Sequence, residues 1–148
     1  MEIDLAKYQG VFYEVYRQNA DFELFCDIPP LGQPSNVSAT YIYVNENKIK
    51  VINSCVGKNG YAINVYGEAK KSSQLPPNEL WLTLNVQEHE INSRYIVFYT
   101  DYVNYSIVGN LQNNYLSFLS RTRTIEPKIF SLLATIAELN GFHIEHNF

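Results

Sequence analysis

The chain has 148 residues, 46% of them hydrophobic and 18% charged, a composition that suits one folded domain over residues 1–148 and excludes a disordered chain. Its formal net charge is -4 and its Lys and Arg residues are scattered, which excludes the basic surface required for binding nucleic acid. Twelve tyrosines and eight phenylalanines favour β-strands, because aromatic side chains pack well on a sheet.

We expect neither a membrane-spanning helix nor a signal peptide within this sequence. No segment approaches the roughly 20 consecutive apolar residues of a membrane-spanning helix, so we predict no transmembrane segment and leave contact with a membrane surface open. Met1 to Asp4 lack the charged start and apolar stretch of a signal peptide. We expect either a cytoplasmic protein or a mature form from which a leader was removed, and either a monomer or a homodimer.

Short runs rich in Val, Ile, Tyr and Phe are separated by Asn, Gly, Pro or Ser, a pattern typical of consecutive antiparallel strands. The eight runs are 11–18, 36–44, 48–56, 62–70, 79–86, 95–99, 105–111 and 115–121. Apolar and polar residues alternate in 48–53 and 81–86, so one face of these strands should contact an apolar interior. Closing the sheet would remove its exposed edges and leave room for one small ligand, although a two-sheet sandwich also fits the pattern.

One connection, from about Asn19 to Ser35, is long and contains four prolines or glycines together with apolar residues. The apolar residues are Phe22, Leu24, Phe25, Ile28 and Leu31. Loops of this length usually have a function, and the apolar content predicts that this one packs on the protein. A lid over the mouth of a barrel would suit it.

One helix is predicted after the last strand. Pro127 suits the first helical position and Gly141 the position just past the end. The apolar stripe comprises Ile129, Phe130, Leu133, Ile136 and Ala137. Because the stripe covers one face only, we expect this helix to lie against the outside of the sheet.

Three short motifs occur in order along the chain. The first lies at the start of the first strand, the second precedes the seventh strand and the third ends the eighth; their residues are Gly10, Phe12, Thr100, Asp101, Tyr102 and Arg121. In this order they resemble the three motifs of the lipocalin family, of which the first is a Gly-x-Trp and the third an arginine. The resemblance covers about residues 4–142. Phe12 stands in the place of the family's Trp. The chain is most similar to the branch of bacterial lipocalins, plant temperature-induced lipocalins and apolipoprotein D.

The resemblance implies an all-β fold, an eight-stranded up-and-down antiparallel barrel with one C-terminal helix. It also implies that Arg121 crosses the ring of Phe12 at the closed end, in a cation–π contact worth roughly 0.5 to 2 kcal/mol. Gly10 would permit close approach of the N-terminal segment, and Thr100 and Asp101 would bond to turn amides. These roles build the fold, and none is catalytic.

The function implied by the resemblance is binding, storage or transport of a small hydrophobic ligand, of the fatty acid or lysophospholipid class, with its head near the open end and no cofactor. The residues that we assign to the inner faces of the strands are Tyr16, Tyr41, Asn53, Tyr66, Trp81, Phe98, Ile107 and Phe118. A slip of one residue would reverse any of them. Arg17 is a candidate for contact with a ligand anion, or else a solvated surface charge.

Cys26 and Cys55 are too few for a disulfide scaffold, and one bridge or two buried free thiols both remain open. In insect and crustacean lipocalins the cysteine that resembles Cys26 pairs with one near the C-terminus, which this chain lacks. A thiol-dependent lipid isomerase is an alternative function, since one lipocalin relative carries its reactive cysteine inside the barrel. Lys48, Lys50 and Lys58 are the local cations that could activate Cys55.

Two further alternatives follow from the same residues. A barrel filled by its own aromatic side chains could act as a protein-interaction module, because Tyr suits both cores and interfaces. His143 and His146 flank Glu145, but their spacing does not match a zinc site, so we predict no metal.

Overall fold

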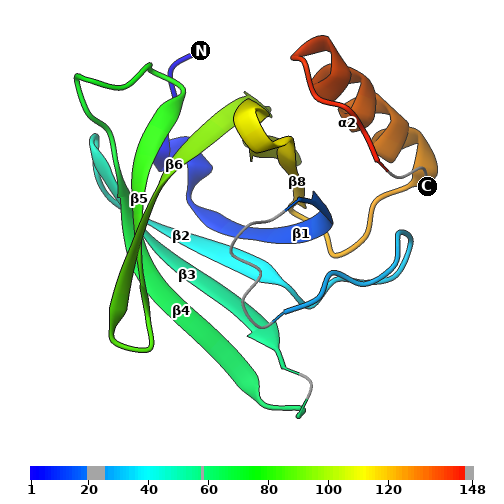
Figure 1. Cartoon of the computed structure of the whole chain (residues 1–148), viewed down its shortest axis with the longest axis horizontal. Helices are drawn as coiled ribbons and strands as arrows, with labels where there is room; N and C mark the ends of the chain where they lie inside the picture. The colour runs from blue at the N-terminus through cyan, green and yellow to red at the C-terminus, as the bar shows by residue number, and fades with distance from the viewer. Residues whose placement is uncertain (20–25, 58, 146–148) are drawn as a thin grey trace.

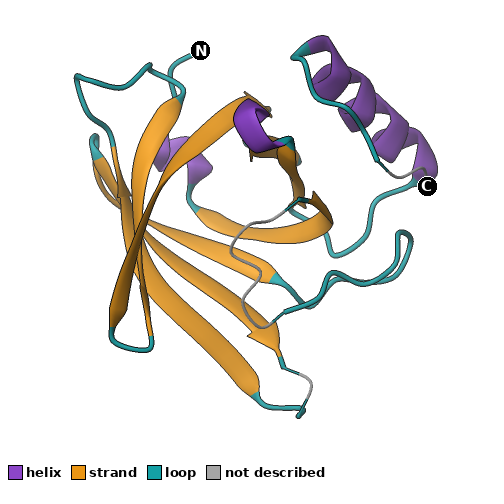
Figure 2. Cartoon of the chain, in the orientation of Figure 1, coloured by secondary structure: helices purple, strands orange, loops and turns teal. Residues whose placement is uncertain are grey.

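The computed structural model describes residues 1–19, 26–57 and 59–145. Its eight strands form one closed antiparallel barrel, in which β1 (Gly10–Gln18) pairs with β8 (Tyr115–Ser120). The other strands are β2 (Ser38–Asn45), β3 (Lys48–Val56), β4 (Ala62–Lys70), β5 (Glu79–Val86), β6 (His89–Thr100) and β7 (Tyr105–Asn110). Helix α2 (Pro127–Leu139) lies outside the ring of strands (Figures 1 and 2). The predicted barrel and C-terminal helix are confirmed, and the two-sheet sandwich is excluded.

The barrel closes because β1 changes partner along its length. Residues 10–13 pair with β2, whereas residues 13–18 pair with β8. A bulge between Glu14 and Tyr16 interrupts the pairing with β8, and such a bulge bends a strand. The bulge also places Glu14 and Arg17 on the same side of the strand, facing the interior.

Strand β6 is longer than the predicted run 95–99, since it begins at His89 and ends at Thr100. Its first half pairs with β5 across a tight turn at Gln87 and Glu88, whose φ angles are 50° and 69°. The polar residues of this half gave no apolar run, so the sequence pattern missed it. These polar side chains fit in the strand because one face of the β5–β6 hairpin is exposed to solvent.

The closed end of the barrel is built from α1 (Leu5–Tyr8) and the motif residues. Arg121 stacks on Phe12, with its guanidinium carbon 3.6 Å from the ring centroid. The same guanidinium donates to the carbonyls of Gln9 and Val11, both at 3.0 Å, and of Tyr102 at 2.9 Å. The predicted meeting of Phe12 and Arg121 is therefore confirmed, and burial lowers the pKa of Arg121.

Gly10 has a φ of +107°, a conformation that favours glycine, and a Cβ there would lie 3.0 Å from Nη1 of Arg121. In the turn between β6 and β7, Asp101 accepts from the amides of Asn104 and Tyr105, both at 2.8 Å, as predicted. Thr100 accepts from the amide of Tyr102 at 2.9 Å. Partial burial acts to raise the pKa of Asp101, but the hydrogen bonds that it accepts from Tyr105 and Asn104 outweigh burial and lower that pKa.

Helix α2 covers part of the outer surface of the barrel. Its buried residues are Phe130, Leu133, Ala134 and Ala137. We call the hydrophobic layer that they form with barrel residues the outer layer; its barrel side includes Val15, Tyr16, Ile107, Leu116 and Phe118. The helix begins at Pro127 and is followed by Gly141 with a φ of +104°, as its sequence predicted. Leu31 of the long connection also packs on this layer.

Candidate functional site

A cavity of about 400 Å³ lies inside the barrel, within the roughly 300 to 1,000 Å³ usual for small-molecule sites. Its walls are mainly aliphatic: Ala39, Ile63, Val65, Leu82, Leu84, Ile91, Val108 and Leu119. Side chains that alternate inward from all eight strands supply these walls and the polar groups among them. Asn113 and Cys26 also line the cavity, so it extends to the end of the barrel where β8 begins, which we call the mouth.

Tyrosine hydroxyls form the opposite end of the cavity, its floor. Tyr41 and Tyr95 line the cavity, and their hydroxyl oxygens are 2.8 Å apart. The hydroxyl of Tyr95 also lies 2.8 Å from that of Tyr8, which in turn lies 2.7 Å from Oγ of Ser106. Tyr8 and Ser106 are fully buried, so this chain of hydroxyls connects the cavity to the closed end.

Burial keeps the three tyrosine hydroxyls of the floor uncharged. It raises the pKa of Tyr8 to about 12, although its hydrogen bonds with Ser106 and Tyr95 act in the opposite direction. Burial also raises the pKa values of Tyr41 and Tyr95 well above 10, and the negative charge of Glu14 adds to the effect on Tyr41. The floor therefore offers neutral hydrogen-bonding groups at physiological pH.

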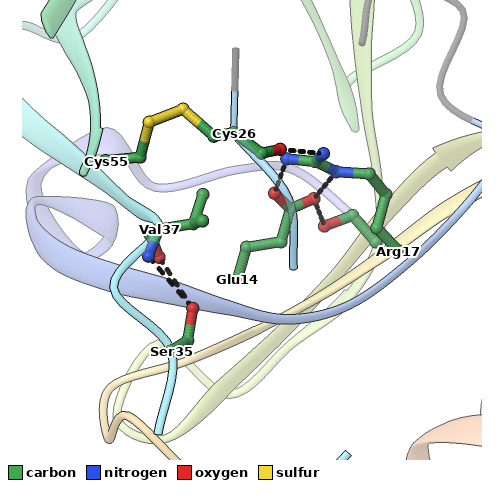
Figure 3. A network of polar contacts seen from close by, with 7 residues as sticks. Glu14, Arg17, Cys26, Ser35, Val37 and Cys55 are labelled. Carbon is green, nitrogen blue, oxygen red and sulfur yellow. Dashed lines mark hydrogen bonds and ion pairs between the residues drawn. A yellow bond between two sulfur atoms is a disulfide. The ribbon is translucent and has the colours of Figure 1, made fainter. Parts of the chain in front are cut away.

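An ion pair lies on the cavity wall where β1 bulges. The guanidinium of Arg17 donates to both carboxylate oxygens of Glu14, at 2.6 and 3.2 Å, and to the carbonyl of Cys26 at 2.9 Å (Figure 3). Ser117 donates to the same carboxylate at 2.6 Å. The side chains of Arg17 and Glu14 are only 17% and 12% exposed. Arg17 is thus a paired cavity residue and not the solvated surface charge of the alternative prediction.

A disulfide joins Cys26 to Cys55 on β3 (Figure 3), which resolves the alternatives left open by the sequence. It ties the long connection to the barrel beside the mouth, and Ser35 holds the other end, since its amide donates to the carbonyl of Arg123 and its carbonyl accepts from Nε of Arg123, both at 2.8 Å. The sulfur of Cys55 is consequently not a thiol. The part of the predicted lid that contains Phe22, Leu24 and Phe25 lies outside the described residues.

The structure brings only two of the predicted ligand-binding residues, Tyr41 and Asn53, to the cavity. Four others belong to the outer layer: Tyr16, Phe98, Ile107 and Phe118. The bulge in β1 reverses the alternation before Tyr16, and a second bulge, after Val97 in β6, does so at Phe98. Ile107 and Phe118 lie one position away from residues that line the cavity. Their predicted inward orientation was therefore wrong by one register step, which moves a side chain to the opposite face.

Tyr66 and Trp81 were also predicted to face inward and instead lie on the outer surface, 56% and 44% exposed. Trp81 shares its side of β5 with Thr83 and Asn85, while the leucines between them line the cavity. The alternation itself pointed Trp81 outward, and the preference for aromatic rings inside the barrel was misleading. A ligand contact with either residue has no support in this geometry.

Sequence reasoning missed Glu14, Tyr95 and Ser117 as cavity residues. A signal for Tyr95 existed, because Ile91, Ser93 and Tyr95 alternate and all line the cavity. A signal existed for Glu14 too, because it follows the buried Phe12 by two positions and precedes the bulge; only the inward position of Arg17 depends on the bulge. The charge of Glu14 argued against an inward position, because a charged residue in a strand usually faces solvent.

Among residues 1–19, 26–57 and 59–145, no group of His, Cys, Asp and Glu side chains could hold a metal ion. His146, one of the histidines weighed above, lies outside these ranges. No helix within the described residues has the length and apolar character needed to cross a membrane.

Known proteins resemble this chain in sequence and in fold. The model of the lipocalin-like domain family matches residues 3–146. Apolipoprotein D of Mus musculus is 28% identical over 151 residues, covering 96% of this chain and 73% of its own length. The putative lipocalin R877 of Acanthamoeba polyphaga mimivirus is 26% identical over 151 residues, covering 97% and 82%.

A solved structure shares the barrel as well. Insecticyanin from the tobacco hornworm, Manduca sexta, superposes with a TM-score of 0.72 and 19% identity, over 97% of this chain and 77% of its own. This likeness concerns the fold alone. Because the family model spans nearly the whole sequence and the closed barrel agrees with it, the chain belongs to the lipocalin family of the calycin superfamily, whose members generally bind and transport small hydrophobic molecules and are generally not enzymes.

Proposed function

We propose that this chain binds one small hydrophobic molecule reversibly inside the barrel. The observation that carries the proposal is the cavity of about 400 Å³ with mainly aliphatic walls. Removal of apolar ligand surface from water drives binding, at about 0.8 kcal/mol per buried methylene. A long acyl chain would gain around 10 kcal/mol before the entropic cost of ordering is subtracted.

The cavity also argues against a barrel that serves only as an interaction module. That alternative requires the interior to be filled by the chain's own aromatic side chains. Most aromatic residues expected inside are instead in the outer layer or on the surface, as are Phe118 and Trp81. The space that they leave is available to a ligand.

The finer ligand class, fatty acid or lysophospholipid, remains a prediction from the family resemblance. Its anionic head would need a cation, and Arg17 is the cation on the cavity wall nearest the bulge. Arg17 already donates to both carboxylate oxygens of Glu14. A fatty acid would have to compete with Glu14 for the same guanidinium, and the cost of desolvating its charge would be poorly compensated.

A thiol-dependent isomerase has less support than a carrier. Its nucleophile would be the Cys55 thiolate, and that sulfur is bonded to Cys26. The isomerase would require the disulfide to be reduced before the enzyme could act. Turnover of a lipid by the reduced protein, abolished by Cys55→Ala, would support the enzyme instead.

The test of the carrier proposal pairs ligand detection with one cavity-filling variant. Native mass spectrometry before and after organic extraction should reveal a bound lipid mass that extraction removes. Val65→Trp places a large ring in the cavity and should abolish rebinding, whereas Tyr66→Trp, on the next residue and the outer face, should leave rebinding unchanged. Equal binding by folded Val65→Trp and wild type would contradict a site inside the barrel.

A further inference from the structure

The hydroxyl groups at the cavity floor contain one more hydrogen than their mutual contacts use. Ser106, Tyr8, Tyr95 and Tyr41 form an unbranched row of three contacts, 2.7, 2.8 and 2.8 Å long. Each hydroxyl has one hydrogen, and each hydrogen bond uses one. Within the described residues these four oxygen atoms contact no other hydrogen-bonding group. One hydrogen of the row is therefore not donated inside it.

Burial decides where the unused hydrogen lies. Ser106 and Tyr8 are both 0% exposed, and an unpaired donor in such a position is costly. Ser106 therefore donates to Tyr8, and Tyr8 donates to Tyr95. The last contact, between Tyr95 and Tyr41, can run in either direction, so the unused hydrogen belongs to one of these two. Both residues line the cavity, and either arrangement presents one O–H donor to it.

The charges around the cavity favour an uncharged partner for this donor. The charged residues among the described lining are Glu14, Arg17 and Arg94. Arg17 is paired with Glu14, and Arg94 with Glu79, so neither guanidinium is left for a ligand anion. An anion at the floor would lose its water without gaining a cation, because the guanidinium at the closed end, that of Arg121, already donates to backbone carbonyls. A neutral acceptor loses much less on leaving water.

We propose that the floor donates one tyrosine hydrogen bond to the ligand, and that the preferred ligand is an uncharged apolar molecule ending in an acceptor such as a ketone or ester carbonyl. The acceptor end lies at the closed end of the barrel, and the hydrocarbon part contacts the aliphatic walls toward the mouth. This orientation is opposite to the one implied by the family resemblance. The inference rests on the proposed carrier function and specifies the ligand class for the same cavity.

The row of hydroxyls predicts an unusual response to mutation. In Tyr41→Phe the hydrogen of Tyr95 takes over as the free donor, so this single change should have a small effect. The double variant Tyr41→Phe/Tyr95→Phe removes both cavity-facing hydroxyls. It should raise the Kd of 2-dodecanone about fivefold, the equivalent of one neutral hydrogen bond, and leave the Kd of dodecane unchanged. Tyr66→Phe, on the outer surface, is the matched control.

The experiment measures displacement of an uncharged fluorescent probe by 2-dodecanone, dodecane, methyl dodecanoate and dodecanoate. Methyl dodecanoate should bind more tightly than dodecanoate. The reverse order, with the affinity for dodecanoate lost in Arg17→Met, would assign the ligand head to Arg17 and overturn the inference. An equal effect of the double variant on ketone and alkane would overturn it as well.

A measurement on the wild-type protein covers the case in which the double variant does not fold. The infrared carbonyl band of bound 2-dodecanone should shift to lower frequency than in hexane, because a hydrogen bond weakens the carbonyl. An unshifted band means that the floor does not donate to the ligand. If dodecane binds and the band is unshifted, only this inference fails. If none of the four compounds binds, the carrier proposal itself fails.

Discussion

The cavity floor and the outer layer are both buried and rich in aromatic rings, yet their rings are used differently. On the floor, Tyr8, Tyr41 and Tyr95 are joined through their hydroxyl groups. In the outer layer, Phe118 and Phe130 are simply packed, with ring centroids 5.6 Å apart. The difference teaches that the floor joins its rings into one row of hydroxyls that reaches the cavity, whereas the outer layer uses its rings to pack the helix, even where one of them, Tyr16, donates to Gln18.

If the outer layer serves stability alone, damage to it should unfold the protein without changing ligand affinity. Leu133, on the inner face of α2, is fully buried, and Leu133→Ala should lower the free energy of unfolding by about 2 to 5 kcal/mol, because it leaves a cavity. Leu132→Ala, on the exposed side of the same helix, should change it far less. Denaturant unfolding and probe binding on both variants test this, and a large loss of affinity in folded Leu133→Ala would contradict the separation of the two regions.

Removal of the disulfide tests whether the bridge beside the mouth stabilises the barrel. Cys26 and Cys55 are 29 residues apart, and a bridge across a loop of this length stabilises by about 3 kcal/mol through the unfolded state. The double variant Cys26→Ser/Cys55→Ser should therefore lower the melting temperature. The expected loss should also appear when the wild type is reduced, and should not appear when the double variant is treated with reductant.

The smallest effect is expected from a hydroxyl of the floor, and it changes the free energy of unfolding only in alkaline solution. The pKa of Tyr8 is raised to about 12, above the value of about 10 in an unfolded chain. Its neutral form therefore stabilises the fold fully below about pH 10, and this contribution is lost as the pH rises through about 12. The free energy of unfolding of Tyr8→Phe should decline less steeply over that range. Equal slopes for both proteins would contradict the burial of this hydroxyl.

Much of the fold followed from the sequence because alternation and turn residues are local properties. The run 48–56 matched β3 at both ends, and Phe12 met Arg121 as the motif order predicted. The first half of β6 was missed because its polar residues are paired by a neighbouring strand, which no local pattern records. Pairing between strands is decided by the whole sheet.

The candidate site was less predictable than the fold. Inward orientation depends on register, and one bulge was enough to reverse it at Tyr16. Trp81 was predicted to face the cavity because aromatic rings were expected there, although the polar residues on its side of β5 indicated that this side faces solvent. Tyr41 and Asn53 were placed correctly in the cavity, but their contact with a ligand remains a prediction.

Bulges in β1 and β6 have a consequence for how such a protein could evolve. Each inserts an extra residue, after Glu14 in one strand and after Val97 in the other. At each bulge two consecutive residues join the outer layer, Val15 with Tyr16 and Phe98 with Tyr99. The described residues on the inner sides of the same strands line the cavity and do not contact the helix. Mutations at cavity positions can change cargo preference while the scaffold keeps its stability, which makes ligand choice and folding separately adjustable traits.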